Sequence, residues 1–254
     1  MNDCFIPEWP AAAFAVGAVS TTRRGGVSHT PYDDGAGGSG FNLGLHVGDD
    51  ALRVAENRAR LRAMLPAEPV WLSQVHGASV VDAAEGQDVP EADASFTSRP
   101  GVVCAILTAD CLPVLLADSA GAVVAAAHAG WRGLAHGVLQ NTVARMRQAG
   151  AGDIVAWLGP AIGPERFEVG AEVRAAFVDG DAAAGAAFIA QANGKYMADI
   201  YHLARLALAS CGVRAVSGGD HCTVTEASLF YSYRRDGVTG RMASMIWIPA
   251  TRRG

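Results

Sequence analysis

Three side chains able to bind a metal, or to act as nucleophile and base, stand at the ends of apolar runs. His76 ends the run PVWLSQVH, Cys111 follows VVCAILTAD, and His128 ends GAVVAAAH. Each run has the character of a β-strand, and side chains at strand ends combine a fixed backbone with access to a crevice. We therefore expect His76, Cys111 and His128 to meet at one site.

Two chemistries fit these groups, and the residues alone leave both open. Two histidines and a cysteine can bind zinc as three protein ligands, leaving a fourth position for water or substrate. Alternatively, Cys111 is a thiolate nucleophile with His128 or His76 as its base, oriented by the other histidine or by Asp110. The ligand spacings of 35 and 17 positions follow no short zinc motif and do not separate the two.

Arginine and glycine segments indicate where an anion could bind. The stretch HAGWRGLAHG places Arg132 among small residues just before an expected helix, so backbone N–H groups and the guanidinium could hold phosphate. TTRRGG (21–26), which contains Arg23, and SYRRDGVTGR (232–241) are similar loops. Lys195 is the single lysine among 20 basic residues, so one arginine by itself carries little information.

The elements that position these groups are amphipathic helices and short apolar strands. The helices are expected at 49–65, 133–150 and 199–212. The first is capped by Asp49 or Asp50, and the charged residues of this helix are expected to face away from the core. Several strands are apolar on both faces, and strands and helices do not alternate regularly, which favours an α+β fold of layered mixed sheets flanked by helices. The strands are expected at 69–75, 102–108, 112–117, 121–127, 154–158 and 242–248.

Composition narrows the class of protein. A chain of 254 residues, half of them hydrophobic, fits one domain over 1–254 with a flexible Gly-rich surface loop at 33–40. The net charge of −5 gives no general attraction for nucleic acid or an anionic membrane. With no membrane span, signal peptide or CxxC among five scattered cysteines, we expect a cytoplasmic protein with reduced thiols. Without a GxGxxG or Walker loop, nucleotide-binding folds of those types are disfavoured.

Six segments, in consistent order from about residue 5 to 249, resemble the YfiH-type family, long labelled polyphenol oxidase or laccase-domain proteins. This resemblance implies a sandwich of mixed sheets related to bacterial cysteine-type toxin hydrolases. Two departures from the family pattern are the Gly-rich insertion at 33–40 and Glu226, where an aspartate is common. The segments are FNLGLHVGDD, WLSQVHG, LTADCLPVLLAD, AAAHAGWRGL, LGPAIGP…FEVG and FYSYRRDGVTGRMASMIW.

The resemblance also implies an activity and a ligand set. The motifs QVHG, ADCLP and HAGWRG assign metal binding to His76, Cys111 and His128, with zinc as the implied metal and copper reported for some members. The implied reactions are phosphate-dependent cleavage of adenosine, inosine and 5'-methylthioadenosine, and hydrolytic deamination of adenosine. Arg132 and Arg23 are the candidates for binding phosphate. The expected partners are purine nucleoside and phosphate, without nucleic acid, membrane or an obligate protein partner.

Three other functions compete with this one. A metal-free cysteine hydrolase that edits a peptidoglycan precursor would use Cys111 as its nucleophile. A copper-dependent polyphenol oxidase would need several copper sites, and the seven histidines include no HxH pair and no dense cluster. A non-enzymatic partner-binding protein would keep its role after loss of Cys111.

Overall fold

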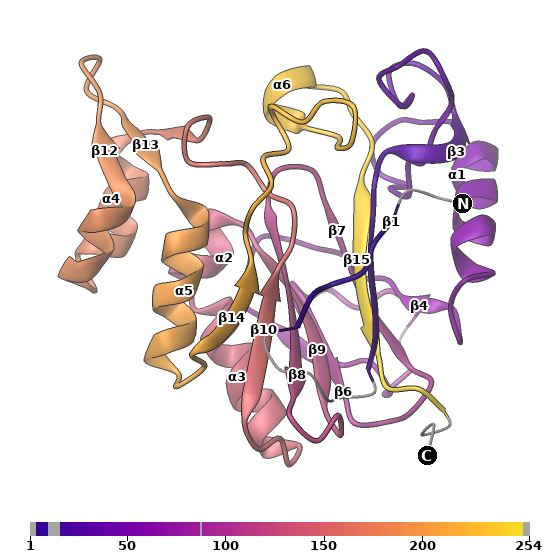
Figure 1. Cartoon of the computed structure of the whole chain (residues 1–254), viewed down its shortest axis with the longest axis horizontal. Coiled ribbons are helices and arrows are strands. Elements are labelled where there is room, and N and C mark those ends of the chain that lie inside the picture. The colour runs from indigo at the N-terminus through magenta and orange to yellow at the C-terminus, as the bar shows by residue number, and fades with distance from the viewer. Residues whose placement is uncertain (1–3, 10–15, 87, 251–254) are drawn as a thin grey trace.

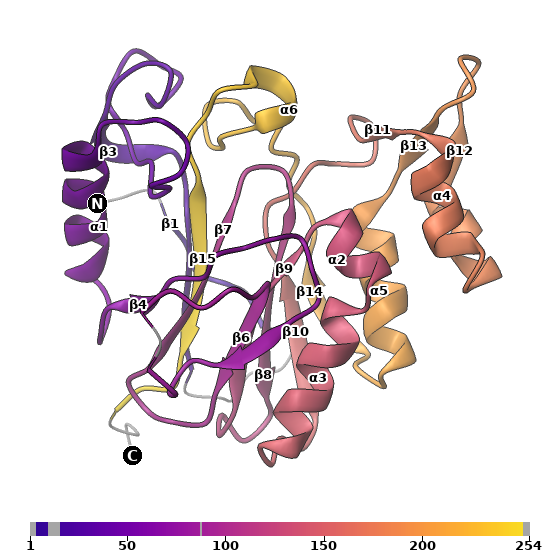
Figure 2. The ribbon, with the colours of Figure 1, turned by 180° about the vertical axis from the view of Figure 1, so that it is seen from behind.

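The structure, a computed structural model, describes residues 4–9, 16–86 and 88–250. Two mixed β-sheets pack face to face, and helices cover their outer faces (Figures 1 and 2). The α+β sandwich of mixed sheets expected from the sequence is therefore confirmed.

Both sheets are mixed. Both edge strands of the six-stranded sheet pair parallel with their neighbours, as does one edge strand of the five-stranded sheet, and the other pairings are antiparallel. The five-stranded sheet has the order β1 (Cys4–Phe5), β2 (Gly17–Thr21), β15 (Met242–Trp247), β7 (Val103–Thr108) and β4 (Pro69–Val70). The six-stranded sheet has the order β14 (Ala215–Gly218), β10 (Ile154–Leu158), β8 (Leu112–Asp118), β9 (Val124–Ala129), β6 (Ala94–Thr97) and β5 (Val80–Asp82).

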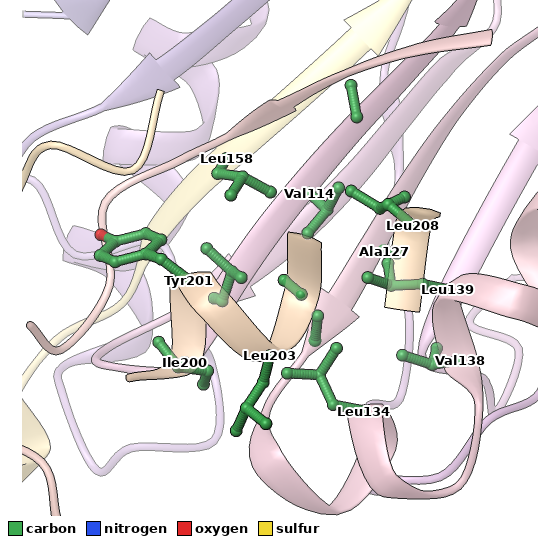
Figure 3. Close-up of a cluster of buried hydrophobic side chains, with 14 of the residues drawn as sticks. Val114, Ala127, Leu134, Val138, Leu139, Leu158, Ile200, Tyr201, Leu203 and Leu208 are labelled. Atoms are coloured by element: carbon green, nitrogen blue, oxygen red, sulfur yellow. The ribbon is translucent and has the colours of Figure 1, made fainter. Parts of the chain in front are cut away.

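The strands of the inner layers are apolar on both faces because each sheet is covered on both sides. Ile106 of β7 and Ile246 of β15 meet Leu115 of β8 and Trp157 of β10 between the sheets. The opposite face of the six-stranded sheet packs against α2 (Trp131–Ala135), α3 (Val138–Gln148) and α5 (Ile200–Ser210). Figure 3 shows this second layer, with Val114 and Leu158 of the sheet facing helix residues. Those helix residues include Leu134, Leu139, Leu203 and Leu208.

Helix α1 (Ala51–Arg62) covers the outer face of the five-stranded sheet and lies beside β3 (Arg24–Ser28) (Figure 1). Leu61 of α1 packs with strand residues of β7 and β15. The expected cap is present, since the Asp50 side chain accepts a hydrogen bond from Leu52 N at 2.8 Å.

The sequence did not predict a group of short elements that lies between β10 and α5. A three-stranded antiparallel sheet packs there against a helix and a 3-10 helix, at the end of the molecule remote from α1 (Figure 1). These elements are β11 (Glu168–Val169), α4 (Ala171–Val178), the 3-10 helix Ala182–Ala187, β12 (Phe188–Ala190) and β13 (Tyr196–Ala198), and a last short helix, α6 (Tyr233–Asp236), precedes β15.

The structure corrects several expected boundaries. The helix expected at 133–150 is two helices, because Gly137 has a left-handed φ of 84° between α2 and α3. The strand expected at 69–75 is only β4, and the strand expected at 121–127 begins later and runs to Ala129, so that His128 lies within β9. The expected helix at 199–212 and strand at 154–158 correspond to α5 and β10.

The Gly-rich segment 33–40 forms turns at the surface of the protein. Gly35 N donates to Asp33 Oδ1 at 2.7 Å, and Ala36 N and Gly38 N donate to Asp34 Oδ1 at 2.8 Å each. Within the described ranges, no helix has the length and apolar character needed to cross a membrane.

Candidate metal centre

His76, Cys111 and His128 meet, as the sequence predicts. Their ligand atoms all lie within 4.8 Å of one another. Cys111 Sγ is 3.8 Å from His76 Nε2, and the two imidazole rings meet edge to face with centroids 4.8 Å apart. His128 is buried, Cys111 is half-buried and His76 is exposed. The ligand group therefore extends from the protein interior to its surface.

The three residues belong to different parts of the fold, and His128 lies within β9. Cys111 lies in the short connection between β7 and β8, which belong to different sheets, so this connection crosses from one sheet to the other. His76 does not end a strand as expected, but follows a loop that continues beyond β4. Gln74 fastens that loop to the sheet, because its side chain donates to Leu107 O and accepts from Leu107 N, each at 2.8 Å.

Asp93 organises the site, although no expectation from the sequence included it. Its Oδ1 accepts hydrogen bonds from His128 Nδ1 at 2.8 Å and from His76 N at 2.9 Å. Its Oδ2 accepts from Gly77 N at 2.6 Å. Because a carboxylate only accepts, His128 carries its proton on Nδ1 and presents Nε2 to the site. One buried carboxylate thus fixes both the His76 loop and the His128 ring.

The backbone on both sides of the site adopts a conformation that side chains other than glycine rarely take. Among the described residues, His76 (φ 61°) and Asp110 (φ 85°) are the non-glycine residues with positive φ. Such strain persists where surrounding contacts hold it and clusters at functional sites. Asp110 does not orient a histidine, because its carboxylate accepts from Thr223 Oγ1 at 2.5 Å and from Arg234 N at 2.6 Å.

Gly130 leaves room for the ligand atoms. A Cβ at this position would lie 2.9 Å from Cys111 Sγ and 3.4 Å from His76 Cδ2. Its φ of −61° is available to any residue, so close approach and not backbone conformation requires the glycine. The small residues after His128 therefore serve the ligand group directly.

Electrostatics favours charged forms of Cys111 and His128. Burial by itself would raise the pKa of the Cys111 thiol, but His128 and then His76 outweigh it and lower this pKa to about 6. Burial would likewise lower the pKa of His128, but Cys111 and Asp93 raise it to about 9. Without a metal, the two groups form a thiolate and imidazolium pair near neutral pH.

The donor set fits a divalent transition metal. Two ligands of a tetrahedral zinc ion, at roughly 2.0 and 2.3 Å from it, are about 3.5 Å apart, close to the 3.8 Å between Cys111 Sγ and His76 Nε2. Three protein ligands leave one position open, and the Asp93 contact to His128 is the outer-shell carboxylate that such sites use. Within the described part of the chain, His76, Cys111 and His128 form the one cluster of at least three potential metal ligands.

Two cavities adjoin the ligand group, and both are lined by His76 and Cys111. The large cavity, of about 760 Å³, is lined by all three ligands and by Arg58, Arg241 and Tyr233, among others. The small cavity, of about 260 Å³, shares His76, Cys111 and Tyr233 with it and is lined further by Trp131 and Phe167. Tyr233 belongs to α6, which lies at the same end of the molecule as the loop between β7 and β8 (Figure 1). The large cavity has the size of a small-molecule site.

The two arginines expected to bind phosphate lie apart from each other. Arg132 lines the small cavity with its guanidinium 4.4 Å from the Trp131 ring. Arg23 is 5% exposed and donates to Asp33 O and Ala227 O at 2.9 Å each, with its guanidinium over Tyr231. The structure does not bring Arg23 to either cavity described above.

Asp93, Arg58 and Arg241 are the residues near the site that sequence reasoning missed. Asp93 stands in PEADASFTS, where an acid before a short strand has no distinguishing signal. Arg58 belongs to the polar side of the expected helix 49–65, whose charges were expected to face away, but it is half-buried with its guanidinium 4.1 Å from the Trp71 ring. Arg241 ends SYRRDGVTGR, one of the arginine and glycine loops noted above.

Comparisons with known proteins agree with this architecture. The family described as multi-copper polyphenol oxidoreductase laccase matches residues 17–249. A protein of Escherichia coli K12 named purine nucleoside phosphorylase YfiH is 55% identical over 98% of this chain and 100% of its own. A purine nucleoside phosphorylase of Pseudomonas aeruginosa is 53% identical over 98% of this chain and 99% of its own.

Solved structures give the same result. A Neisseria meningitidis protein superimposes with a TM-score of 0.89 at 48% identity, covering 98% of this chain and 100% of that one. YlmD of Geobacillus stearothermophilus superimposes with a TM-score of 0.82 at 33% identity, covering 92% of each chain.

Proposed function

The chain belongs to the family described as multi-copper polyphenol oxidoreductase laccase, and from this premise we propose that it is a metal-dependent purine nucleoside phosphorylase. The observation that carries the proposal is the 55% identity, over 98% of the chain, to a relative of that name. The reaction transfers the ribosyl group of a purine nucleoside to phosphate, giving the free base and ribose 1-phosphate. Adenosine, inosine and 5'-methylthioadenosine are the proposed nucleosides.

In this proposal His76, Cys111 and His128 hold the metal, and zinc is the metal that the donor set favours. When bound, it supplies positive charge that stabilises negative charge developing at the reacting atoms. The several copper sites of a multi-copper oxidase would need further ligand groups, and the described residues gather one.

The chain's own residues orient the reactants and the ligands. Asp93 holds the proton of His128 on Nδ1 and keeps the 75–77 loop in place. The large cavity offers apolar walls such as Leu72 and Leu107 beside charged groups, so a nucleoside and an anion fit together next to the ligands. Tyr233 lines both cavities and is 61% exposed, which places an aromatic ring at the opening for the purine to contact.

The test compares purified wild-type protein with Cys111→Ala and with the matched control Cys211→Ala, whose cysteine ends α5 outside both cavities. Bound metal is measured by elemental analysis, and adenine release from adenosine is measured with and without phosphate. We expect phosphate-dependent adenine release and bound zinc in wild type and Cys211→Ala, and neither in Cys111→Ala. Wild-type protein that binds zinc but releases neither adenine from adenosine or 5'-methylthioadenosine nor hypoxanthine from inosine would sink the proposal.

Adenosine deamination is the second reaction that the resemblance implies, and the same assay reads it as ammonia and inosine. A metal held by three protein ligands would keep a position for water, and this supports the reaction because a metal-bound water has a lowered pKa. Ammonia released without phosphate, and lost in Cys111→Ala, is the expected result. Phosphorolysis without ammonia would confine the activity to ribosyl transfer.

A metal-free cysteine hydrolase is the alternative that one specific observation favours. Cys111 interacts with His128, and His128 is hydrogen-bonded to Asp93, so the three side chains could act as nucleophile, base and orienting acid. His76 decides between the two functions, because a hydrolase of this kind does not need it and a metal site does. Retained activity in His76→Ala and after removal of metal by a chelator would favour the hydrolase.

A further inference from the structure

We infer that Arg58 and Arg241 form the subsite for the phosphate co-substrate, in the large cavity and not beside Arg132. This inference rests on the proposed function, because phosphate is the second reactant of that reaction. It also gives a role to two segments, FNLGLHVGDD and VTGR, that the metal centre leaves without one.

The large cavity carries positive charge without an acid to balance it. Among the described residues that line it there is no aspartate or glutamate, while Arg58 and Arg241 each contribute a guanidinium group. Neither arginine forms an ion pair with any described residue, and their guanidinium groups donate only to backbone carbonyls. Half-buried guanidinium groups without a counter-ion are the usual binding groups for phosphate.

The charges act on one another and on the metal centre. Burial lowers the pKa of His46, and Arg241 and then Arg58 lower it further, so His46 is neutral near pH 7 and the positive charge of this region comes from the two arginines. Arg241 also lies within electrostatic range of Cys111, with which it lines the cavity. Glu68, which acts on Arg58 from a distance, is occupied by a hydrogen bond of 3.0 Å from Trp71 Nε1. An anion between the arginines would therefore lie next to the ligand group.

Both arginines are held in place before any ligand binds. Arg58 Nε donates to Leu43 O at 2.9 Å while its guanidinium stacks on Trp71. Arg241 N donates to Asn42 Oδ1 at 2.9 Å, and Asn42 is fully buried. A Cβ on Gly44 would lie 2.8 Å from Arg241 Cγ, so this glycine makes room for the arginine. The FNLGLH segment thus holds the Arg58 guanidinium and the backbone of Arg241, while Thr239 O and Gly240 O accept from the Arg241 guanidinium. Holding both groups in place lowers the entropy cost of binding.

The small cavity is less suited to phosphate. Asp110 contributes a carboxylate to its lining. Arg234 donates to Glu168 O at 3.1 Å and lies within electrostatic range of the Glu168 carboxylate. Trp131 and Phe167 give this cavity flat apolar surface instead. The small cavity therefore has a carboxylate among its lining residues, whereas the described lining of the large cavity has none.

The experiment titrates inorganic phosphate into the metal-loaded protein by isothermal titration calorimetry, and measures KM for phosphate and for nucleoside. The variants are Arg58→Gln, Arg241→Gln and the rival Arg132→Gln. Arg60→Gln is the matched control, since Arg60 lies on the same helix but is exposed and paired with Glu56 at 2.9 Å. Each lost charge-assisted contact should weaken phosphate binding roughly 10- to 100-fold in Arg58→Gln and Arg241→Gln, with KM for nucleoside little changed.

The outcomes separate this inference from the proposed function. Phosphate binding that is lost in the two variants and kept in Arg60→Gln supports the inference even if no nucleoside is cleaved. Phosphate affinity and KM for phosphate that stay at the wild-type values in Arg58→Gln overturn it, even if the wild-type protein is a phosphorylase. Phosphate affinity that falls, with a raised KM for phosphate, only in Arg132→Gln overturns it as well. Wild-type protein that binds no phosphate overturns it as well. Circular dichroism checks folding, and Arg58→Gln decides alone if Arg241→Gln does not fold.

Discussion

Asp93 Oδ1 accepts a hydrogen bond from His128 Nδ1 at 2.8 Å, and the two side chains are 0% and 4% exposed. The same carboxylate group receives the backbone N–H groups of His76 and Gly77. One acid therefore determines the tautomer of one ligand and the loop conformation of another.

Asp93→Asn should weaken zinc binding roughly 10- to 100-fold, as changes to outer-shell partners typically do. An amide has one accepting oxygen, so its NH₂ group would face either the His128 proton or the N–H of Gly77. Competition with a chromophoric chelator measures the affinity. Asp118→Asn is the control, because Asp118 is 2% exposed and accepts backbone N–H groups in the turn between β8 and β9. Equal zinc affinity in Asp93→Asn and wild type would remove the role given to Asp93.

Gly130→Ala should reduce zinc affinity with little loss of folding stability. The added methyl group would stand 2.9 Å from Cys111 Sγ, so the ligand must move, whereas the backbone at φ −61° accepts alanine. Zinc content and thermal melting of the purified variants measure the two effects. Gly152→Ala is the matched control, since a Cβ there meets nothing within 4 Å. The idea fails if the two variants hold zinc equally well.

The metal-free protein should show a reactive Cys111 at neutral pH. With the thiol pKa lowered from 9.0 to about 6, the rate of alkylation by iodoacetamide should be near its maximum at neutral pH and fall by half near pH 6. Zinc should protect the thiol. Mass spectrometry locates the modified cysteine, and buried Cys104, whose pKa burial raises to about 12, serves as an internal control. A Cys111 rate that first rises only near pH 9 would contradict the charged pair.

The same pair should make the stability of the metal-free protein depend on pH. The lowered pKa of Cys111 contributes stability that is lost as the pH falls through about 6. The raised pKa of His128 contributes stability that is fully present below 6.5 and lost as the pH rises through about 9. The difference in melting temperature between wild type and Cys111→Ala should therefore be largest between these values. A difference that does not vary with pH would contradict this.

The helix layer on the five-stranded sheet can be tested on α1. Leu61 is 0% exposed against β7 and β15, so Leu61→Ala should cost about 2–5 kcal/mol of unfolding free energy. Leu52→Ala on the same helix is the control, because Leu52 is 81% exposed and its loss should change stability by under about 0.5 kcal/mol. Urea unfolding measures both. Equal stability of the two variants would mean that α1 does not pack on the sheet as described.

The sequence predicts the longer elements well because their patterns are local. The Asp199 cap and the apolar face of α5 lie within a single helix, and the β10 run is apolar on both faces. The split at Gly137 was missed because the apolar spacing continues across it. The three-stranded sheet beside α4 was missed because its strands have only two or three residues each. Such strands leave too short a pattern to recognise.

What the sequence by itself determined is a choice between two chemistries, metal binding or a thiolate nucleophile, because His76, Cys111 and His128 each follow or end an apolar run and their types limit the reactions available. What only the tertiary structure decided is which other residues act with them. Asp93 reaches His128 through the pairing of β6 with β9, and Arg58 and Arg241 reach one cavity from α1 and the start of β15. Sequence separation carries no distance, so residues on different elements become neighbours only when the sheets close.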